Sequence, residues 1–169
     1  MVSTPIQNFE QTVADLPVRL ERTTTDAFDQ TLSACLDEPA VGVPLPLDDL
    51  SLTDHPITMD PTARELDDAV TGVTPAGPAI AEYGTVVVPS DEHGAEQIGL
   101  YSDTHIAVVA ASTIVESLSD AIGVVSDNIE NGLTSAVLTT GPSVTADMGA
   151  PVYGAHGASE LHIILVEDQ

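Results

Sequence analysis

Residues 135–166 read SAVLTTGPSVTADMGAPVYGAHGASELHIILV, two apolar runs joined through polar, glycine-containing segments. Apolar runs of four to six residues bounded by Gly and Pro, as at 135–140 and 161–166, are typical of strands buried on both faces. Open α/β sheets place their ligand sites in loops that leave the carboxyl ends of such strands, so these loops should meet at one edge of the sheet. The stretch therefore predicts an α/β fold, with a candidate site formed by loops 141–147 and 153–162.

The rest of the chain alternates between helical and extended patterns. Apolar spacing of three and four predicts helices over 4–15, 25–36 and 117–133, and the segment 61–68 suits a short helical turn. Further strands are predicted at 18–21, 40–43, 69–72, 85–88 and 105–111. Strands separated by helices predict a layered, mainly parallel sheet with helices on both faces, and 169 residues suit one domain.

The charge of the chain is strongly one-sided. It has 27 acidic residues, three arginines and no lysine, which gives a formal net charge of −24. A hydrophobic fraction of 43% is too high for a disordered chain, so the acids are expected on the surface of a folded protein. Salt screens such a surface, which predicts a cytoplasmic protein of a halophile. Nucleic acids and anionic membranes are disfavoured as partners.

Cysteine content and hydropathy limit the other possibilities. A single cysteine, Cys35, excludes an internal disulfide and any all-cysteine iron–sulfur or zinc site. The sequence MVSTPIQNFEQ at positions 1–11 lacks the basic and apolar regions of a secretory signal, and no apolar run is long enough to span a bilayer.

Three motifs in order carry a family resemblance. They are AIAEYGTVVV at 79–88, GPSVTAD at 141–147, and HG followed by LH before the last apolar run. Together they resemble the LUD (lactate utilisation) domain, LutC/YkgG group, clearly over 69–166 and weakly before that. Tyr83 departs from the family, which usually has a small polar residue there. The resemblance implies a fold similar to the NagB/RpiA/CoA-transferase group.

The loop GPSVTAD has two interpretations from its residues alone. It is equally well a plain turn, in which Ser143 or Asp147 caps the backbone, or a ligand loop. The resemblance favours a ligand loop for a small carboxylate or phosphate, held by hydroxyls and backbone N–H groups because lysine is absent. The binding residues expected on this basis are Gly84, Thr85, Gly141, Ser143, Thr145, Asp147, Gly157 and Glu160.

Glu82 and His156 are the candidate catalytic residues. Glu82 stands before Gly84 in the family motif, and the CoA transferases of similar fold use a Glu near a Gly as nucleophile, although a base or an anchoring role is equally open. His156 could donate to an anion or move a proton. His105 and His162, each at the start of an apolar strand, are interpreted as structural. His156 and His162 with Asp147 or Glu160 could hold a metal, but no ligand spacing supports this and no metal is expected.

Two hypotheses for function follow from the resemblance. The first is a LutC-like subunit of a system that oxidises lactate to pyruvate. Its iron–sulfur clusters would then lie on separate oxidoreductase subunits, because this chain has no ligands for a cluster and no dinucleotide motif. The second is an independent enzyme of CoA-transferase or isomerase type that uses Glu82. The sequence does not distinguish a catalytic subunit from an accessory one.

Overall fold

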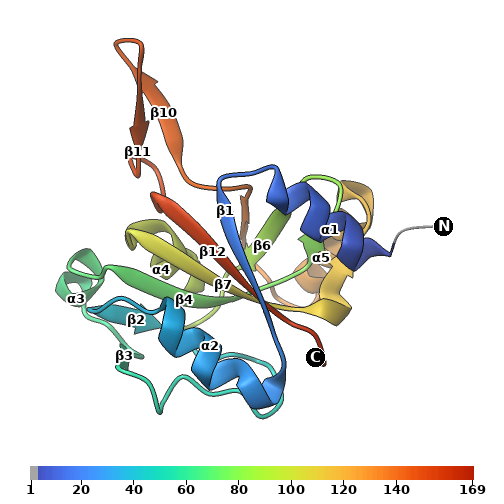
Figure 1. Ribbon diagram of the computed structural model, residues 1–169, viewed down its shortest axis with the longest axis horizontal. Helices are drawn as coiled ribbons and strands as arrows, with labels where there is room; N and C mark the ends of the chain where they lie inside the picture. Colours follow the sequence, from blue (N-terminus) through green and yellow to red (C-terminus); the bar gives the residue numbers. More distant parts are fainter. Residues whose placement is uncertain (1–3) are drawn as a thin grey trace.

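The computed structural model describes residues 4–169 and is built around a six-stranded parallel sheet. The strand order is β1-β12-β7-β4-β2-β3, and every neighbouring pair is parallel. The strands are β1 Val18–Thr23, β2 Ala40–Gly42, β3 Ile57–Thr58, β4 Thr71–Ala76, β7 Thr104–Ala110 and β12 Glu160–Val166. The predicted mainly parallel α/β fold is therefore confirmed (Figure 1).

Apolar side chains of the central strands alternate between two cores, one on each face of the sheet. On β12, Leu161, Ile163 and Leu165 pack with helices α1 (Pro5–Ala14) and α4 (Ala95–Tyr101). Ile164 and Val166 point the other way and pack with α2 (Phe28–Cys35) and the connection that follows β2. Because successive side chains of a strand point to opposite faces, an apolar run such as 161–166 is buried on both sides.

A second, smaller sheet lies beside the first, and the sequence did not predict it. Its order is β8-β5-β6-β9, with β5 Ala79–Ile80, β6 Thr85–Pro89, β8 Ile114–Val115 and β9 Ala136–Thr139. Strand β6 is antiparallel to β5 and to β9, so the predicted strands 85–88 and 135–140 belong to this mixed sheet. Apolar runs indicate burial but not the partner strand, which is why the pattern could not separate the two sheets.

Helix α5 (Leu118–Glu130) covers the outer face of the smaller sheet. Ala121 is 1% exposed and packs against Ile80 and Val87. The Ser117 side chain accepts a hydrogen bond from the Asp120 N–H and forms a capping box, which fixes where the helix begins. The predicted helix 117–133 is confirmed, although Ile122 and Ile129 remain more than half exposed.

The motif GPSVTAD is not a compact loop. Its last four residues form β10 (Val144–Asp147), which pairs with β11 (Ala150–Tyr153) in an antiparallel hairpin that stands away from the body (Figure 1). Met148 and Gly149 at the tip have φ of 47° and 82°, as a two-residue type I′ turn requires. Both predictions for this motif, a plain turn and a ligand loop, were therefore incomplete.

The remaining elements are short. They are a 3₁₀ turn at Thr25–Ala27, α3 at Ala63–Asp67 and a second 3₁₀ turn at Ala111–Thr113. The connection between β2 and α3 crosses the surface of the α2 face and contributes Leu45, Leu50 and Leu52 to that core. No helix within residues 4–169 has the length and hydropathy that a membrane crossing needs.

Candidate functional site

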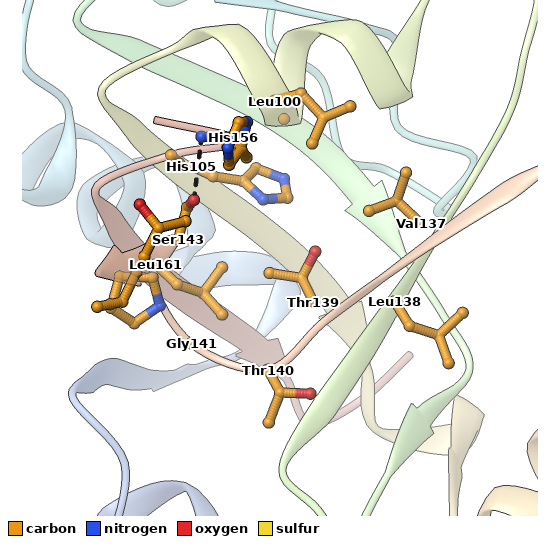
Figure 2. A pocket seen from close by; sticks show the side chains of 16 residues that line it. Leu100, His105, Val137, Leu138, Thr139, Thr140, Gly141, Ser143, His156 and Leu161 are labelled. Atoms are coloured by element: carbon orange, nitrogen blue, oxygen red, sulfur yellow. Dashed lines mark hydrogen bonds between the residues drawn. The ribbon is translucent and has the colours of Figure 1, made fainter. Parts of the chain in front are cut away.

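A pocket of about 330 Å³ lies where the end of β9, the base of the hairpin and the loop before β12 meet (Figure 2). Helix α4 and the first residues of β7 and β12 complete its wall. The lining residues are Gly99, Leu100, His105, Val137, Leu138, Thr139, Thr140, Gly141, Pro142, Ser143, Val144, Thr145, His156, Gly157, Ala158 and Leu161. None is an acid, an arginine or a lysine, so in a chain with 27 acidic residues this hollow is lined by uncharged groups and two imidazoles.

Ser143 joins the two predicted loops. Its hydroxyl accepts a hydrogen bond from the backbone N–H of His156 (3.2 Å), and its own N–H donates to the Ala158 carbonyl (2.8 Å). The Ser143 carbonyl accepts from the Gly154 N–H (3.0 Å). The backbone N–H of Ser143 is therefore not available to an anion, although backbone N–H groups of this loop were expected to be donors. The hydroxyl proton of Ser143 can still be donated into the pocket.

Glycine at 141 and 157 lets the chain turn close to this junction. Gly141 has φ +86°, and Gly157 has φ +154° and faces the side chains of Ser143 and Leu100. A Cβ added at Gly157 would come into ordinary contact with these two side chains. Both glycines line the pocket, as does Thr145 at the start of the hairpin. Five of the predicted residues, Gly141, Ser143, Thr145, His156 and Gly157, are thus brought together.

Thr85 supports the pocket from behind. Its hydroxyl lies 2.5 Å from that of Thr140, the residue opposite it across the β6–β9 pair, and Thr140 lines the pocket. Because Thr85 is only 5% exposed, it orients Thr140 and is not itself a lining residue.

Glu82 and Gly84 are not among the residues that line this pocket. The Glu82 carboxylate accepts a hydrogen bond from the Leu118 N–H (3.3 Å) at the start of α5. A hydrogen bond to the same carboxylate is the main cause that raises the pKa of Tyr83. Gly84 has φ +64° and lies against α1, where an added Cβ would come within 2.9 Å of Leu16 Cδ1. The motif Glu-Tyr-Gly-Thr therefore contributes Thr85 to the rear of the pocket, while the rest of it connects β5, α1 and α5.

Asp147 and Glu160 also lie outside the pocket lining. Asp147 is exposed at the end of β10, next to the hairpin tip. Glu160 begins β12, and its carboxylate pairs with Arg19 at 3.0 Å on the neighbouring strand. Solvent surrounds Asp147, and Arg19 pairs with Glu160, so both carboxylates are accounted for without a ligand.

The pocket lies at the opposite end of the parallel strands from the one predicted. The loop of His156 leads into β12, and His105 is the second residue of β7, so the site is at their amino ends. The expected carboxyl-end arrangement is wrong because β9, the strand before the GPSVTAD motif, belongs to the antiparallel part of the smaller sheet. Convergence of loops at one edge holds for parallel strands only.

Sequence reasoning missed three polar residues of the pocket lining, Thr139, Thr140 and His105, of which His105 is the most deeply buried. It is 1% exposed, its Nε2 lies 2.8 Å from the Thr74 hydroxyl, and its ring lies flat against Gly99. Burial lowers its pKa to about 4, so the imidazole is neutral at ordinary pH. A histidine at the start of an apolar strand can be a core residue or part of a pocket wall, and the sequence does not distinguish the two.

The histidines and acids considered for a metal do not come together. His162 points to the α2 face, where its Nε2 lies 3.6 Å from Cys35 Sγ, and burial lowers its pKa. His156 lies on the side of the pocket, toward the other face. Within residues 4–169, no three histidine, cysteine or acidic side chains are placed to share a metal ion.

Comparisons with known proteins place the chain in a family. A family model described as "LUD domain" matches residues 23–166. The lactate utilization protein C of Macrococcus caseolyticus is 29% identical over 89% of this chain and 72% of its own length. The protein of the same name from Bacillus subtilis is 36% identical over 63% of this chain but only 46% of its own length.

The fold has a counterpart among solved structures. A DUF162 family protein from Deinococcus radiodurans superposes with a TM-score of 0.73, with 23% identity and 96% coverage of both chains. At that identity the likeness concerns the fold. The match of the LUD-domain model over most of the sequence carries the assignment: the chain belongs to the LUD domain family.

Proposed function

We propose that this protein is a LutC-like subunit of an iron–sulfur-dependent system that oxidises lactate to pyruvate, and that it holds a small carboxylate or phosphate in the pocket. The name shared by its curated relatives supports a role in lactate utilisation. The chain spans about half the length of the Bacillus relatives, so their activities come to it only as a proposal. The pocket described above is the observation that supports binding of a small ligand.

The chemistry of the pocket favours an anion over any other small ligand. Hydroxyls of Ser143, Thr139 and Thr145 can donate hydrogen bonds, and His156 is exposed and can donate one from its ring. No carboxylate in the lining opposes a negative ligand. The volume of about 330 Å³ lies at the lower end of small-molecule sites, which suits an acid of a few carbon atoms.

The electrons of lactate oxidation would be carried by partner subunits. With Cys35 as its single cysteine, this chain cannot supply the four thiolates of an iron–sulfur cluster. The role proposed here is to dock on iron–sulfur oxidoreductase subunits and to present or retain the small acid. The alternative enzyme, with Glu82 as base or nucleophile, gains no support from a carboxylate placed at the start of α5.

Two measurements test the proposal. The first mixes the purified chain with the iron–sulfur subunits of its own cells and follows lactate-dependent dye reduction, with and without the chain. Activity that needs the chain supports the proposal, and full activity without it contradicts the subunit role. The second is a calorimetric titration of the chain alone with pyruvate, lactate, propanoate and phosphate in 2 M KCl. Binding that Ser143→Ala or His156→Ala weakens supports the pocket, and absence of binding by all four anions contradicts it.

A further inference from the structure

The deepest polar group in the pocket is the ring of His105. In Figure 2 the ring lies between Leu100 and Thr139, and His105 is one of the residues that line the pocket. The outer groups of the pocket, Ser143 and His156, come from the hairpin base and the 154–159 loop, whereas His105 comes from the central sheet. The site therefore has an exposed, anion-compatible side and a neutral floor.

The two nitrogens of the His105 ring have different surroundings. Nε2 is held by the Thr74 hydroxyl at 2.8 Å, while Nδ1 has no hydrogen-bond partner within residues 4–169. Nδ1 is not among the fully sealed side-chain atoms that lack a partner in this part of the chain, and His105 lines the pocket, so we place Nδ1 at the pocket wall. A buried nitrogen without a protein partner can form its hydrogen bond with a molecule that occupies the cavity.

The packing around the ring holds it in this orientation. An added Cβ at Gly99 would lie 3.0 Å from His105 Cε1 and 3.1 Å from Nε2, closer than an ordinary contact, so glycine at this place on α4 lets the ring pack tightly against the helix. Gly99 and Thr74 together fix the plane and one end of the imidazole. Both contacts restrict rotation of the ring, so Nδ1 stays at the pocket wall.

We infer that His105 is a specificity-determining residue, whose Nδ1 makes a hydrogen bond to a neutral oxygen on the second carbon of a small carboxylic acid. The carboxylate of that ligand faces Ser143 and His156, and the carbonyl or hydroxyl oxygen next to it reaches the floor. Because the Thr74 hydroxyl can donate to Nε2 or accept from it, Nδ1 can present a proton or a lone pair. This inference rests on the proposed function, of which it names the substrate class: 2-oxo and 2-hydroxy acids over plain acids.

The preference for the second oxygen is measured against an acid that lacks it. In 2 M KCl we expect the wild-type chain to bind pyruvate or lactate about tenfold more tightly than propanoate, the effect of one hydrogen bond to a neutral group. Equal affinities would overturn the role of His105 and leave the anion pocket standing. Absence of binding by all three acids would overturn both.

Two substitutions test the roles of the two ring nitrogens of His105 separately. The amide of Asn lies near the place of Nδ1, and that of Gln near the place of Nε2. His105→Gln keeps a partner for Thr74 and should lose the preference for pyruvate over propanoate. His105→Asn should retain part of that preference. A purely structural histidine would give lower melting temperatures in both variants with an unchanged affinity ratio.

A measurement on the wild-type chain removes any dependence on how the variants fold. The ¹⁵N chemical shifts of the His105 ring report its tautomer and the hydrogen bond at each nitrogen. We expect pyruvate to move the Nδ1 signal and propanoate, at equal saturation, to leave it in place. Identical shifts with both ligands would contradict the inference.

Discussion

The Ser143 hydroxyl and the backbone N–H of His156 lie 3.2 Å apart and join two motifs that are 13 residues apart in the sequence. Between them the chain runs out along the β10–β11 hairpin and returns, so the pocket is formed where the two ends of the hairpin meet. The hydroxyl is both the support of the His156 loop and a donor toward the pocket. Its removal should affect both roles.

Ser143→Ala tests this junction. The variant should remain folded, with its free energy of unfolding lowered by about 0.5–1.5 kcal/mol, the net value of one hydrogen bond. Pyruvate affinity should fall by about tenfold or more, measured by calorimetry in 2 M KCl. Ser159→Ala is the matched control, because its hydroxyl also forms one hydrogen bond to the backbone, donating to the Asp103 carbonyl, but Ser159 does not line the pocket. Equal loss of affinity in both variants would assign the effect to general loosening of the loop.

The sequence predicted the parallel sheet and the motifs at the site, but not the arrangement of the motifs. The apolar runs 105–111 and 161–166 predicted strands buried on both faces, because continuous apolar runs of this length are typical of such strands. The smaller sheet was missed because β5 and β8 have two residues each, too few to show the alternation of apolar and polar residues that indicates a strand. The hairpin was missed because Met148-Gly149 is an unusual type I′ pair, whereas Asn-Gly would have indicated it.

Residue roles were harder to predict than residue positions. Gly84 was expected at a ligand, yet its positive φ and its contact with α1 explain it fully. His105 was expected in the core, and it is there, but it also lines a cavity that only the folded chain creates. Such a distinction depends on long-range contacts, which periodicity and spacing do not encode.

Gly84→Ala should destabilise the fold while leaving the pocket groups in place. A left-handed residue that acquires a Cβ costs about 1–3 kcal/mol, and here that Cβ also meets Leu16. Gly123→Ala is the matched control: it lies in the middle of α5 with open space around it, and the change should stabilise the protein by about 0.5–1 kcal/mol. Chemical denaturation of both variants checks the opposite signs. A stable Gly84→Ala protein would show that the turn before β6 can adopt another backbone.

The buried imidazole of His105 should make stability depend on pH. Its pKa is about 4 when folded and 6.5 when exposed, so between these values the unfolded chain binds the additional proton. Stability from this group is therefore fully present above pH 6.5 and is lost as the pH falls toward 4. Protonation of the many carboxylates acts in the same range, so the measured quantity is the difference between wild type and His105→Gln in 2 M KCl. Parallel stability curves for the two proteins from pH 7 to 4.5 would contradict the assignment.

Salt should stabilise the fold. The three arginines already lie in ion pairs, Arg19 with Glu160, Arg22 with Glu10 and Glu167, and Arg64 with Asp68. The other carboxylates have no lysine or arginine to offset them, and their mutual repulsion is screened over about 10 Å at 0.1 M salt but about 3 Å at 1 M. We expect the melting temperature to rise between about 0.1 M and 2 M KCl, a range that spans most of the screening. A melting temperature that does not change would argue against adaptation to high salt.

Anion affinity should also rise with salt, in contrast to most charged sites. The pocket lining has no acid, but the net charge of −24 surrounds it with a negative potential that repels a carboxylate. Added salt screens that repulsion, while the hydrogen bonds from Ser143, His156 and the threonine hydroxyls act at contact and are little affected. Pyruvate affinity should therefore increase from 0.2 M to 2 M KCl under conditions where circular dichroism shows the chain folded at both concentrations. His156→Gln serves as the control, since it removes the protonatable group of the exposed side but not the surrounding field, and its affinity should be lower yet rise with salt in the same way. If affinity instead falls as salt is added, attraction to a local positive charge outweighs the repulsion from the surface carboxylates, which contradicts the prediction.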